Sequence, residues 1–278
     1  MTDREQLLAA IHSLGLEGKE VCIHSSMRSF HEPVQAGADG LLDAFLDAGC
    51  TVMAPTFSYM CEAAPTPEYM PAQNGAGDYS FFLNQARADV EIYDSRSAEM
   101  SVQYMGVFPR AILKRPGRVR GENRLNSFAA AGPCAEMLAG CQTDKDVYAP
   151  FARLYDDDGY VLLIGVELDC ATAIHYAEQK AGRNPFVRWA KDAGGRTVPV
   201  CTGSCSVGFG QLEPYLAGFE KRVTVGGSVW RCYRIRDLVD GCVAAIRKNP
   251  RVTHCGNPEC ARCNDAVLGG PEYGNMFE

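Results

Sequence analysis

The feature that most constrains the fold of this chain is a regular alternation of helix and strand patterns along its first 55 residues. Residues 1–16 carry leucine and isoleucine at helical spacing, and residues 20–25 (EVCIHS) form a short strand pattern. A second helix is expected over 38–48 and a second strand over 50–55. Such alternation is typical of α/β layering, in which helices pack on a sheet with parallel strands.

The same alternation returns later in the chain. The segment 160–166 (YVLLIGV) is the most apolar strand pattern in the sequence, so we expect it near the centre of the sheet. A helix is expected directly after it, over 169–181, and others over 105–113 and 236–247. Residues 186–235 have the pattern of strands and turns.

Two segments lack a clear period. Residues 58–97 are expected to run as a long excursion over the core, the kind that often shapes a substrate site. The tail from Asn249 is expected to be loop-like, and it contains the last three cysteines. We therefore expect one domain over 1–250 and a cysteine-rich appendage over 251–278.

Composition excludes some classes of function. With 34 acidic and 27 basic side chains and a net charge of −7, the chain lacks the excess of Lys and Arg that phosphate contacts to nucleic acid require. No apolar run reaches the roughly 18 residues of a membrane span, and the acidic N-terminus is unlike a signal peptide. We therefore expect a cytoplasmic protein. The 13 cysteines are unusual for that compartment, where disulfides are rare.

Small polar residues stand where the first strand is expected to end. They are His24, Ser25 and Ser26, followed by Met27. Ligands of open α/β sheets collect at such strand ends, where hydroxyl and backbone N–H groups can hold a phosphate or pyrophosphate. The alternative is a serine-rich turn that binds no ligand.

A histidine and a glutamate follow the central strand. His175 and Glu178 are three residues apart, so they lie on one face of the expected helix. A carboxylate beside a histidine can fix its tautomer and raise its basicity, which suits the pair to removing a proton from an amine or a hydroxyl. The alternative is an ordinary surface pair.

Three of the last cysteines have the spacing of metal ligands. The pattern is Cys-x4-Cys-x2-Cys, formed by Cys255, Cys260 and Cys263. Tetrahedral Zn²⁺ needs four ligands, and the fourth is His254, Cys201 or Cys205, of which we select Cys205. The alternative is a set of free thiols on a disordered tail.

A series of short motifs joins these elements between His24 and Leu238. In order they are HSSM at 24–27, QAGA at 35–38, VMAPTFS at 52–58, YD at 93–94, MG at 105–106, RPGRVR at 115–120, SFAAAGP at 127–133, LIGV at 163–166, TAIHYAE at 172–178, GSCSVGF at 203–209 and RDLV at 236–239. This order resembles the aminoglycoside 3-N-acetyltransferase family, the antibiotic N-acetyltransferases whose fold is not of the GCN5 type. The resemblance implies a layered mixed sheet with flanking helices, and makes residues 1–250 an acyltransferase domain.

The resemblance also implies an activity, linked to antibiotic resistance. It is the transfer of an acetyl group from acetyl-CoA to an amine of an aminoglycoside or similar cationic compound, by direct attack on the thioester. It implies His175 as the general base, Glu178 as the residue that orients it, and Thr172 as a donor to the oxyanion or the leaving thiolate. The residues implied to bind CoA are His24, Ser25, Ser26, Met27, Met105 and Gly106.

The chain departs from the family pattern where the acceptor is expected. Asn123 and Asn126 stand where the family has histidines, and asparagine cannot titrate near neutral pH. We expect the acceptor to contact these two residues together with Tyr59 and Asp94. The acidic total suits a cationic acceptor.

Other functions remain open at this point. One is a biosynthetic N-acyltransferase with a different amine or acyl-CoA, and another is a catalytically weakened homologue that binds metal through its cysteines. We expect a homodimer, the commonest assembly of such enzymes, and no nucleic-acid or membrane partner.

Overall fold

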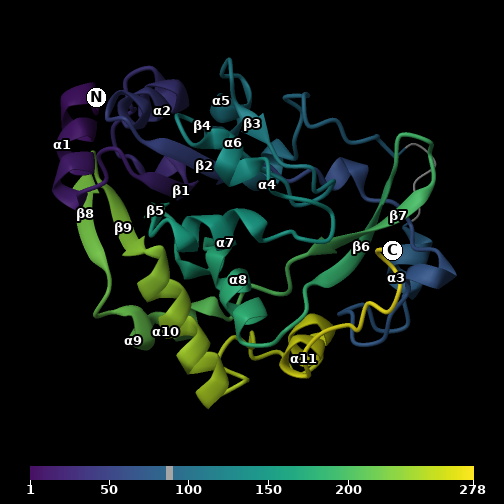
Figure 1. Cartoon of the computed structure of the whole chain (residues 1–278). Helices are drawn as coiled ribbons and strands as arrows, with labels where there is room; N and C mark the ends of the chain where they lie inside the picture. The colour runs from purple at the N-terminus through teal and green to yellow at the C-terminus, as the bar shows by residue number, and fades with distance from the viewer. Residues whose placement is uncertain (86–89) are drawn as a thin grey trace.

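A mixed sheet forms the centre of the protein. The computed structural model describes residues 1–85 and 90–278. Seven strands are ordered β3-β4-β2-β1-β5-β9-β8, and β6 and β7 form a separate two-stranded hairpin (Figure 1). The strands are β1 Glu20–Ser25, β2 Thr51–Pro55, β3 Val119–Arg120, β4 Phe128–Ala131, β5 Tyr160–Ile164, β6 Phe186–Lys191, β7 Thr197–Thr202, β8 Lys221–Val225 and β9 Ser228–Arg234.

Parallel pairing is confined to the middle of this sheet. Strand β1 is parallel to both β2 and β5, whereas β4, β9 and their outer neighbours pair antiparallel. The apolar strand β5 lies between β1 and β9, which confirms its predicted central place. The predicted layered mixed sheet is also confirmed.

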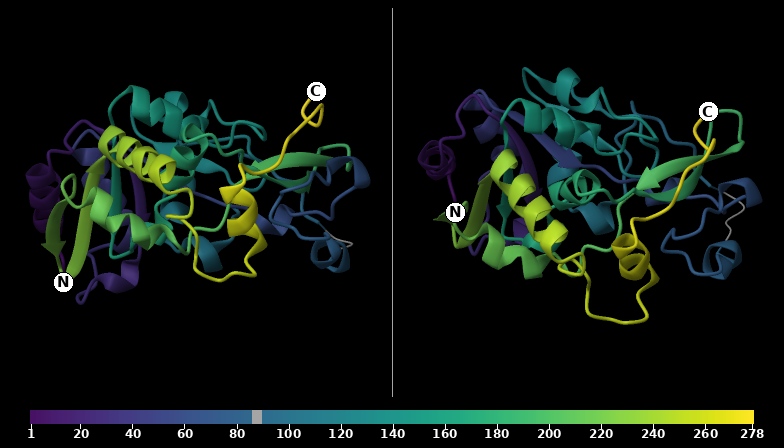
Figure 2. Two further views of the ribbon diagram at one scale, coloured as in Figure 1. Left: turned by 90° about the horizontal axis from the view of Figure 1, so that it is seen from below. Right: turned by 60° about the horizontal axis from the view of Figure 1, so that its bottom comes forward.

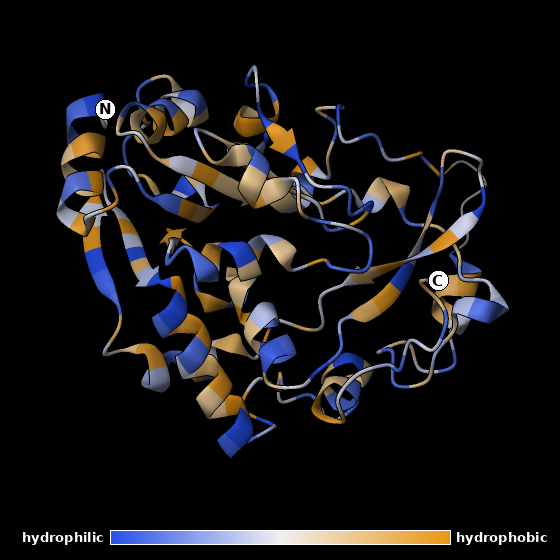
Figure 3. Cartoon of the chain, viewed as in Figure 1, coloured by the Kyte–Doolittle hydropathy of each residue, from blue (hydrophilic) through white to orange (hydrophobic). Residues whose placement is uncertain are grey.

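Helices cover both faces of the sheet. They are α1 Arg4–Leu14, α2 Gly37–Asp47, α3 Ser80–Asn84, α4 Val102–Met105, α5 Phe108–Leu113, α6 Ala135–Ala139, α7 Ala149–Asp156, α8 Ala173–Lys180, α9 Glu213–Leu216, α10 Ile235–Lys248 and α11 Ala261–Val267. Cys22 of β1 packs in the core with α6, α7, α8 and α10, whereas its neighbours Val21 and Ile23 pack with α1, α2 and α5. This alternation is the period of two that a strand buried on both faces must show. In Figure 3, α10 carries blue and orange stretches in turn, as an amphipathic helix does.

Two predicted elements were wrong. The helix predicted over 105–113 is broken at Gly106, whose positive φ of 78° ends α4 before α5 begins at Phe108. The tail predicted as a loop contains α11, which begins after Cys260. The tail has short-range polar anchors that hydropathy does not reveal: the Asn264 amide, for example, donates to the Pro258 carbonyl at 2.8 Å.

The hairpin β6–β7, the described residues of the excursion and the tail gather at the end of the molecule away from α1 (Figures 1 and 2). The excursion runs beside β6: the Ala63 N–H donates to the Trp189 carbonyl, and the Trp189 indole donates to the Tyr69 carbonyl, both at 2.7 Å. The tail lies against the start of β6, where the Tyr273 hydroxyl donates to the Pro185 carbonyl at 2.7 Å. A domain boundary at residue 250 stays a prediction.

The helices are short. Within residues 1–85 and 90–278, none combines the length and the apolar character that crossing a membrane would need.

Candidate active site

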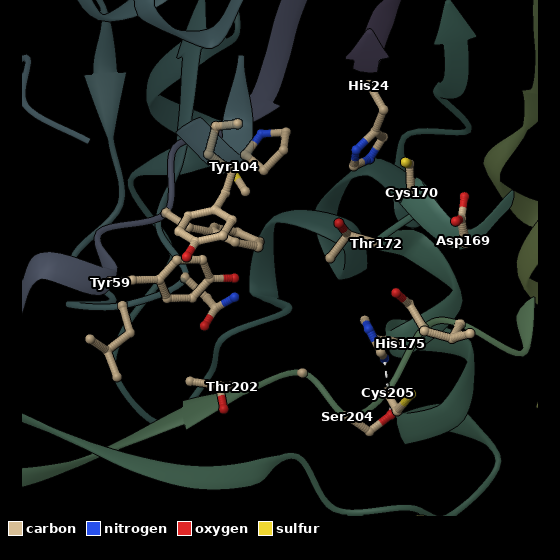
Figure 4. A pocket seen from close by; sticks show the side chains of 18 of the residues that line it. His24, Tyr59, Tyr104, Asp169, Cys170, Thr172, His175, Thr202, Ser204 and Cys205 are labelled. Atoms are coloured by element: carbon tan, nitrogen blue, oxygen red, sulfur yellow. Dashed lines mark hydrogen bonds between the residues drawn. The ribbon is translucent and has the colours of Figure 1, made fainter. Parts of the chain in front are cut away.

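A cavity of about 1220 Å³ opens at the carboxyl ends of β1 and β5 (Figure 4). The hairpin β6–β7, the excursion and α4 supply its other walls. Most of the residues predicted from the sequence to bind CoA or acceptor, or to act in catalysis, line it together: His24, Ser25, Ser26, Met27, Tyr59, Met105, Gly106, Asn126, Thr172 and His175. The fold therefore brings motifs from separate parts of the sequence to one site.

His175 lies in the first turn of α8 and faces this cavity. Its Nδ1 is 2.8 Å from Oε2 of Glu178, one turn further along the helix. The Ser204 hydroxyl donates to the same carboxylate oxygen at 2.9 Å and lies 3.4 Å from the ring nitrogen (Figure 4). Nδ1 is therefore engaged by Glu178 and Ser204, and Nε2 is the ring nitrogen that faces the cavity.

The second oxygen of Glu178 is also bound. Its Oε1 accepts from Nη1 of Arg183 at 2.5 Å and from the Thr253 hydroxyl at 3.1 Å. Burial raises the pKa of Glu178, but its contacts with His175, Arg183 and Ser204 outweigh burial and bring that pKa below its ordinary value. Glu178 is thus a buried, ionised carboxylate that can stabilise a positive charge on His175.

Gly203 leaves the outer nitrogen of His175 accessible. A Cβ at this position would lie 3.0 Å from Nε2 of His175 and 3.1 Å from the Tyr148 hydroxyl. Any larger residue would therefore crowd the atom that faces the cavity. This lack of space explains why the motif GSCSVGF begins with a glycine.

Three buried polar atoms of the cavity wall have no hydrogen-bond partner within the described residues. They are Oγ of Ser25, Oδ1 of Asn126 and the hydroxyl of Tyr148. Leaving such groups unsatisfied costs about 1–3 kcal/mol each, so a ligand that pairs with them gains affinity. Burial raises the pKa of Tyr148 well above its ordinary value, so its hydroxyl stays a proton donor.

His24 enters the same cavity from the end of β1 but has a different environment (Figure 4). Its recorded polar neighbour is Sγ of Cys22, 3.7 Å from Nε2. Burial lowers the pKa of His24 to about 4, so the ring is neutral at physiological pH. His24 can shape the site and donate or accept a hydrogen bond, but it does not carry charge there.

Two residues predicted to contact the acceptor lie elsewhere. Asp94 is exposed and binds Arg96, two residues along the chain. Asn123 is fully buried behind the wall, where its amide donates to the Cys201 carbonyl at 3.0 Å and its oxygen accepts from the Asn126 N–H at 2.7 Å. Asn123 therefore shapes the loop that presents Asn126 to the cavity.

The chain has a net negative charge, but arginines line the cavity as well as carboxylates. Arg28, Arg188 and Arg262 line it together with the carboxylates Glu62 and Asp169. Burial raises the pKa of Glu62 and lowers that of Arg188 to about 10, at which value the guanidinium is still protonated at neutral pH. The site thus offers both signs of charge to a ligand.

The predicted metal ligands also come together. The Sγ atoms of Cys205, Cys255, Cys260 and Cys263 all lie within 4.8 Å of one another, and we call them the four-cysteine cluster. Cys205 comes from the loop after β7, and the other three come from the segment between α10 and the first turn of α11. The cluster lies outside the His175 network, but Cys205 follows Ser204 directly.

Sequence reasoning missed several residues of this site. Ser204 was within a quoted motif but received no role, and Arg183 lies five residues after Glu178, beyond the end of α8. The hydroxyl of Ser204 and the short spacing between Arg183 and Glu178 could have predicted their contacts with the carboxylate. Tyr148 and Thr253 gave no signal, because they reach the His175 network from distant segments.

The sequence of this chain is similar to those of known proteins. A family model described as aminoglycoside 3-N-acetyltransferase matches residues 22–247. Aminoglycoside N(3)-acetyltransferase VIII of Streptomyces fradiae is 29% identical over 246 residues, which cover 86% of this chain and 72% of that protein. Aminoglycoside N(3)-acetyltransferase VII of Streptomyces paromomycinus is 37% identical over 202 residues, 62% of this chain and 70% of that protein.

Solved structures agree with this match. The crystal structure of aminoglycoside acetyltransferase AAC(3)-IVa without ligand has a TM-score of 0.77 at 24% identity, covering 96% of this chain and 98% of that one. The binary complex of AAC-IIIb with CoASH has a TM-score of 0.70 at 20% identity, covering 88% and 96%. These likenesses define the class of protein by its fold, the mixed α/β fold of aminoglycoside acetyltransferases. Because the family model covers most of its length, the chain belongs to the aminoglycoside 3-N-acetyltransferase family.

Proposed function

We propose that this protein transfers an acetyl group from acetyl-CoA to an amine of an aminoglycoside or a related aminated compound, with His175 as the general base. The observation that carries the proposal is the orientation of His175. Its Nδ1 is held by Glu178 at 2.8 Å, and its Nε2 faces a cavity large enough for two substrates.

The chemistry requires a proton acceptor at this place. An amine is protonated in neutral solution and must lose a proton to attack a carbonyl carbon. The first proton of the ammonium group goes to solvent, which leaves a neutral amine to attack. In the proposed reaction a nitrogen–carbon bond forms, the carbon–sulfur bond of the thioester breaks, and a second proton passes from the attacking nitrogen to Nε2 of His175 and from there to the released thiol. A positioned base of this kind contributes typically 10²–10⁴-fold in rate.

The end of β1 has the donors that an acyl-CoA needs. Acetyl-CoA supplies the thioester. Ser25 has a buried hydroxyl without a partner among the described residues, and Ser26 and Met27 follow it on the cavity wall. His24, Met105 and Gly106 complete this side of the proposed CoA site. The complex of AAC-IIIb with CoASH, a protein of the same fold, supports CoA as the ligand.

Thr172 stands at the start of α8, on the cavity wall with His175 (Figure 4). We assign its hydroxyl as a donor to the oxyanion or to the leaving thiolate. A donor placed where charge develops lowers the barrier more than one that binds the ground state.

The acceptor side of the proposal is defined by Tyr59 and Asn126, with the Tyr148 hydroxyl beyond them. A mutant of AAC(3)-IVa has been solved in complex with apramycin, which supports an aminoglycoside as acceptor for this fold. The cavity wall carries both arginines and carboxylates. This mixture favours a second candidate for the acceptor, a biosynthetic amine that also carries negative charge.

Other parts of the proposal rest largely on sequence. A homodimer and a cytoplasmic location are proposed from the sequence alone. A structural Zn²⁺ ion is proposed from the cysteine spacing together with the four-cysteine cluster.

Thiol release from acetyl-CoA, measured over a panel of aminoglycosides and of amines with and without carboxylates, tests the activity. We expect turnover with at least one aminoglycoside, and His175→Ala should lower kcat/KM by about 10²–10⁴-fold while CoA binding changes little. His12→Ala, at an exposed histidine of α1, is the control and should keep full activity.

Two results would count against the proposal. Full activity of His175→Ala would remove its role as the base. CoA binding without turnover on any aminoglycoside, but with turnover on another amine, would favour the biosynthetic candidate.

A further inference from the structure

The four-cysteine cluster has sulfur spacings close to those of a tetrahedral metal site. Zn²⁺ with four thiolates at about 2.3 Å spaces the sulfurs about 3.8 Å apart, and the four Sγ atoms are already within 4.8 Å of one another. Cys205 and Cys263 are buried, and the Cys255 N–H donates to Sγ of Cys263 at 3.3 Å. All 13 cysteines of the chain, none of which falls at 86–89, are free thiols.

The structure also favours Cys205 over the other candidates for the fourth ligand. Both ring nitrogens of His254 are engaged, one with Asn264 at 3.0 Å and the other with the Gly256 N–H at 3.1 Å. Cys201 is fully buried in the hydrophobic core with α7 and α8. Cys205 is the residue that completes a set of four.

The cluster lies at the wall of the cavity, which Cys205 itself lines. Ser204, which donates to Glu178, precedes Cys205 in the loop after β7. Ala261 and Arg262, which stand between two of the other cysteines, line the cavity. A ligand bound by all four sulfurs would therefore hold the loop after β7 and the segment of Ala261 and Arg262 in fixed positions relative to each other.

We infer that the four cysteines bind one Zn²⁺ ion, and that this ion holds the loop of Ser204 in register with His175 and Glu178. Binding releases the four thiol protons to solvent and leaves thiolates on the metal, without any change of oxidation state. The ion then joins two segments that are far apart in the sequence. The effect on catalysis rests on the proposed function, whereas metal binding does not.

Metal content is the first test. The full chain, purified without chelators, should contain about one zinc per chain by elemental analysis. Cys255→Ser should lose it, Cys255→His should keep it because histidine is also a zinc ligand, and the exposed Cys141→Ser should match the unchanged protein. A protein that contains no zinc and takes up none when it is added would overturn the inference, as would a disulfide within the cluster.

Activity is the second test. Zinc-free Cys255→Ser should have kcat/KM for the amine lowered about tenfold, and Cys255→His should recover most of it. If the serine variant does not fold, removal of zinc from the unchanged protein by a chelator and its re-addition give the same comparison. Full activity without zinc would overturn the link to the cavity. Stoichiometric zinc with no acetylation of any amine would contradict the proposed function alone.

Discussion

Two histidines line one cavity, and they differ in whether a carboxylate lies beside the ring. His24 stands at the end of β1 with a cysteine sulfur as its recorded polar neighbour, and burial lowers its pKa to about 4. His175 stands at the start of α8 with a carboxylate 2.8 Å from its inner nitrogen. Both residues are buried to a similar degree, with 6% and 9% of their surface exposed.

The difference lies in the carboxylate and not in the degree of burial, and the proposed function gives the role of base only to the histidine that has this partner. In an apolar site the charged imidazolium is penalised, so a ring like His24 stays neutral and cannot hold a proton at physiological pH. A buried carboxylate offsets that penalty, provided that it is itself kept ionised. At Glu178 the charge of Arg183 and the hydroxyls of Ser204 and Thr253 meet this condition.

The largest effect is expected from a variant that removes the carboxylate beside His175 and so makes its surroundings more like those of His24. Glu178→Gln keeps the shape of the side chain but removes its charge, so the proton taken by His175 loses its counter-charge. We expect kcat to fall about 10²-fold with little change in the KM for acetyl-CoA.

The chain offers a matched control for this variant. His12, near the end of α1, and Glu17, in the turn that follows the helix, form an exposed pair with the same 2.8 Å distance. Glu17→Gln should leave kcat unchanged. An equal loss in both variants, or none in Glu178→Gln, would contradict the role given to Glu178.

A smaller effect is expected at the other histidine, on stability. The folded pKa of His24 lies below its unfolded value of about 6.5, so its contribution to stability is complete above pH 6.5 and is lost as the pH falls toward 4. Between pH 7 and pH 5.5 the unchanged protein should lose about 1 kcal/mol of unfolding free energy more than His24→Asn does.

Urea unfolding at the two pH values measures this difference. His12→Asn, at an exposed histidine, is the control and should follow the unchanged protein. The same loss in His24→Asn as in the unchanged protein would mean that His24 is not the group that titrates.

The smallest effect on activity is expected at Ser204, which supports the carboxylate of Glu178. Ser204→Ala removes one hydrogen bond to Glu178 but leaves Arg183 and Thr253 in place. A hydrogen bond of this kind contributes about 1 kcal/mol, so kcat/KM should fall about fivefold in the acetylation assay. Ser13→Ala, whose hydroxyl binds a carbonyl within α1, should have no effect. A loss as large as that of Glu178→Gln would place Ser204 in the proton transfer itself.

Much of the fold was predictable because its signals are local. The spacing of apolar residues predicted α2, α8 and α10 and the strands β1 and β5, and motif order predicted the family, which is confirmed. The errors arose where one residue overrides a pattern, as Gly106 does between α4 and α5, or where polar anchors replace apolar ones, as in the tail.

The candidate site was predictable in part. His175 and Glu178 were found because one turn of helix places them together, and Cys255, Cys260 and Cys263 because their spacing is short. Asn123 and Asn126 show the limit of such reasoning. They are three residues apart and had the same prediction, yet one is buried behind the wall and the other faces the cavity.

The sequence by itself determined the layering of helices on a sheet, the family and the residue types available for proton transfer and metal binding. These properties follow from period, spacing and side-chain chemistry. Only the tertiary structure decided that Arg183, Ser204 and Thr253 converge on Glu178, that His24 is buried beside a cysteine sulfur, and that Cys205 joins the three cysteines of the tail. The reason is physical: the pKa of a buried group and the assembly of a ligand set depend on which distant segments the core packs together.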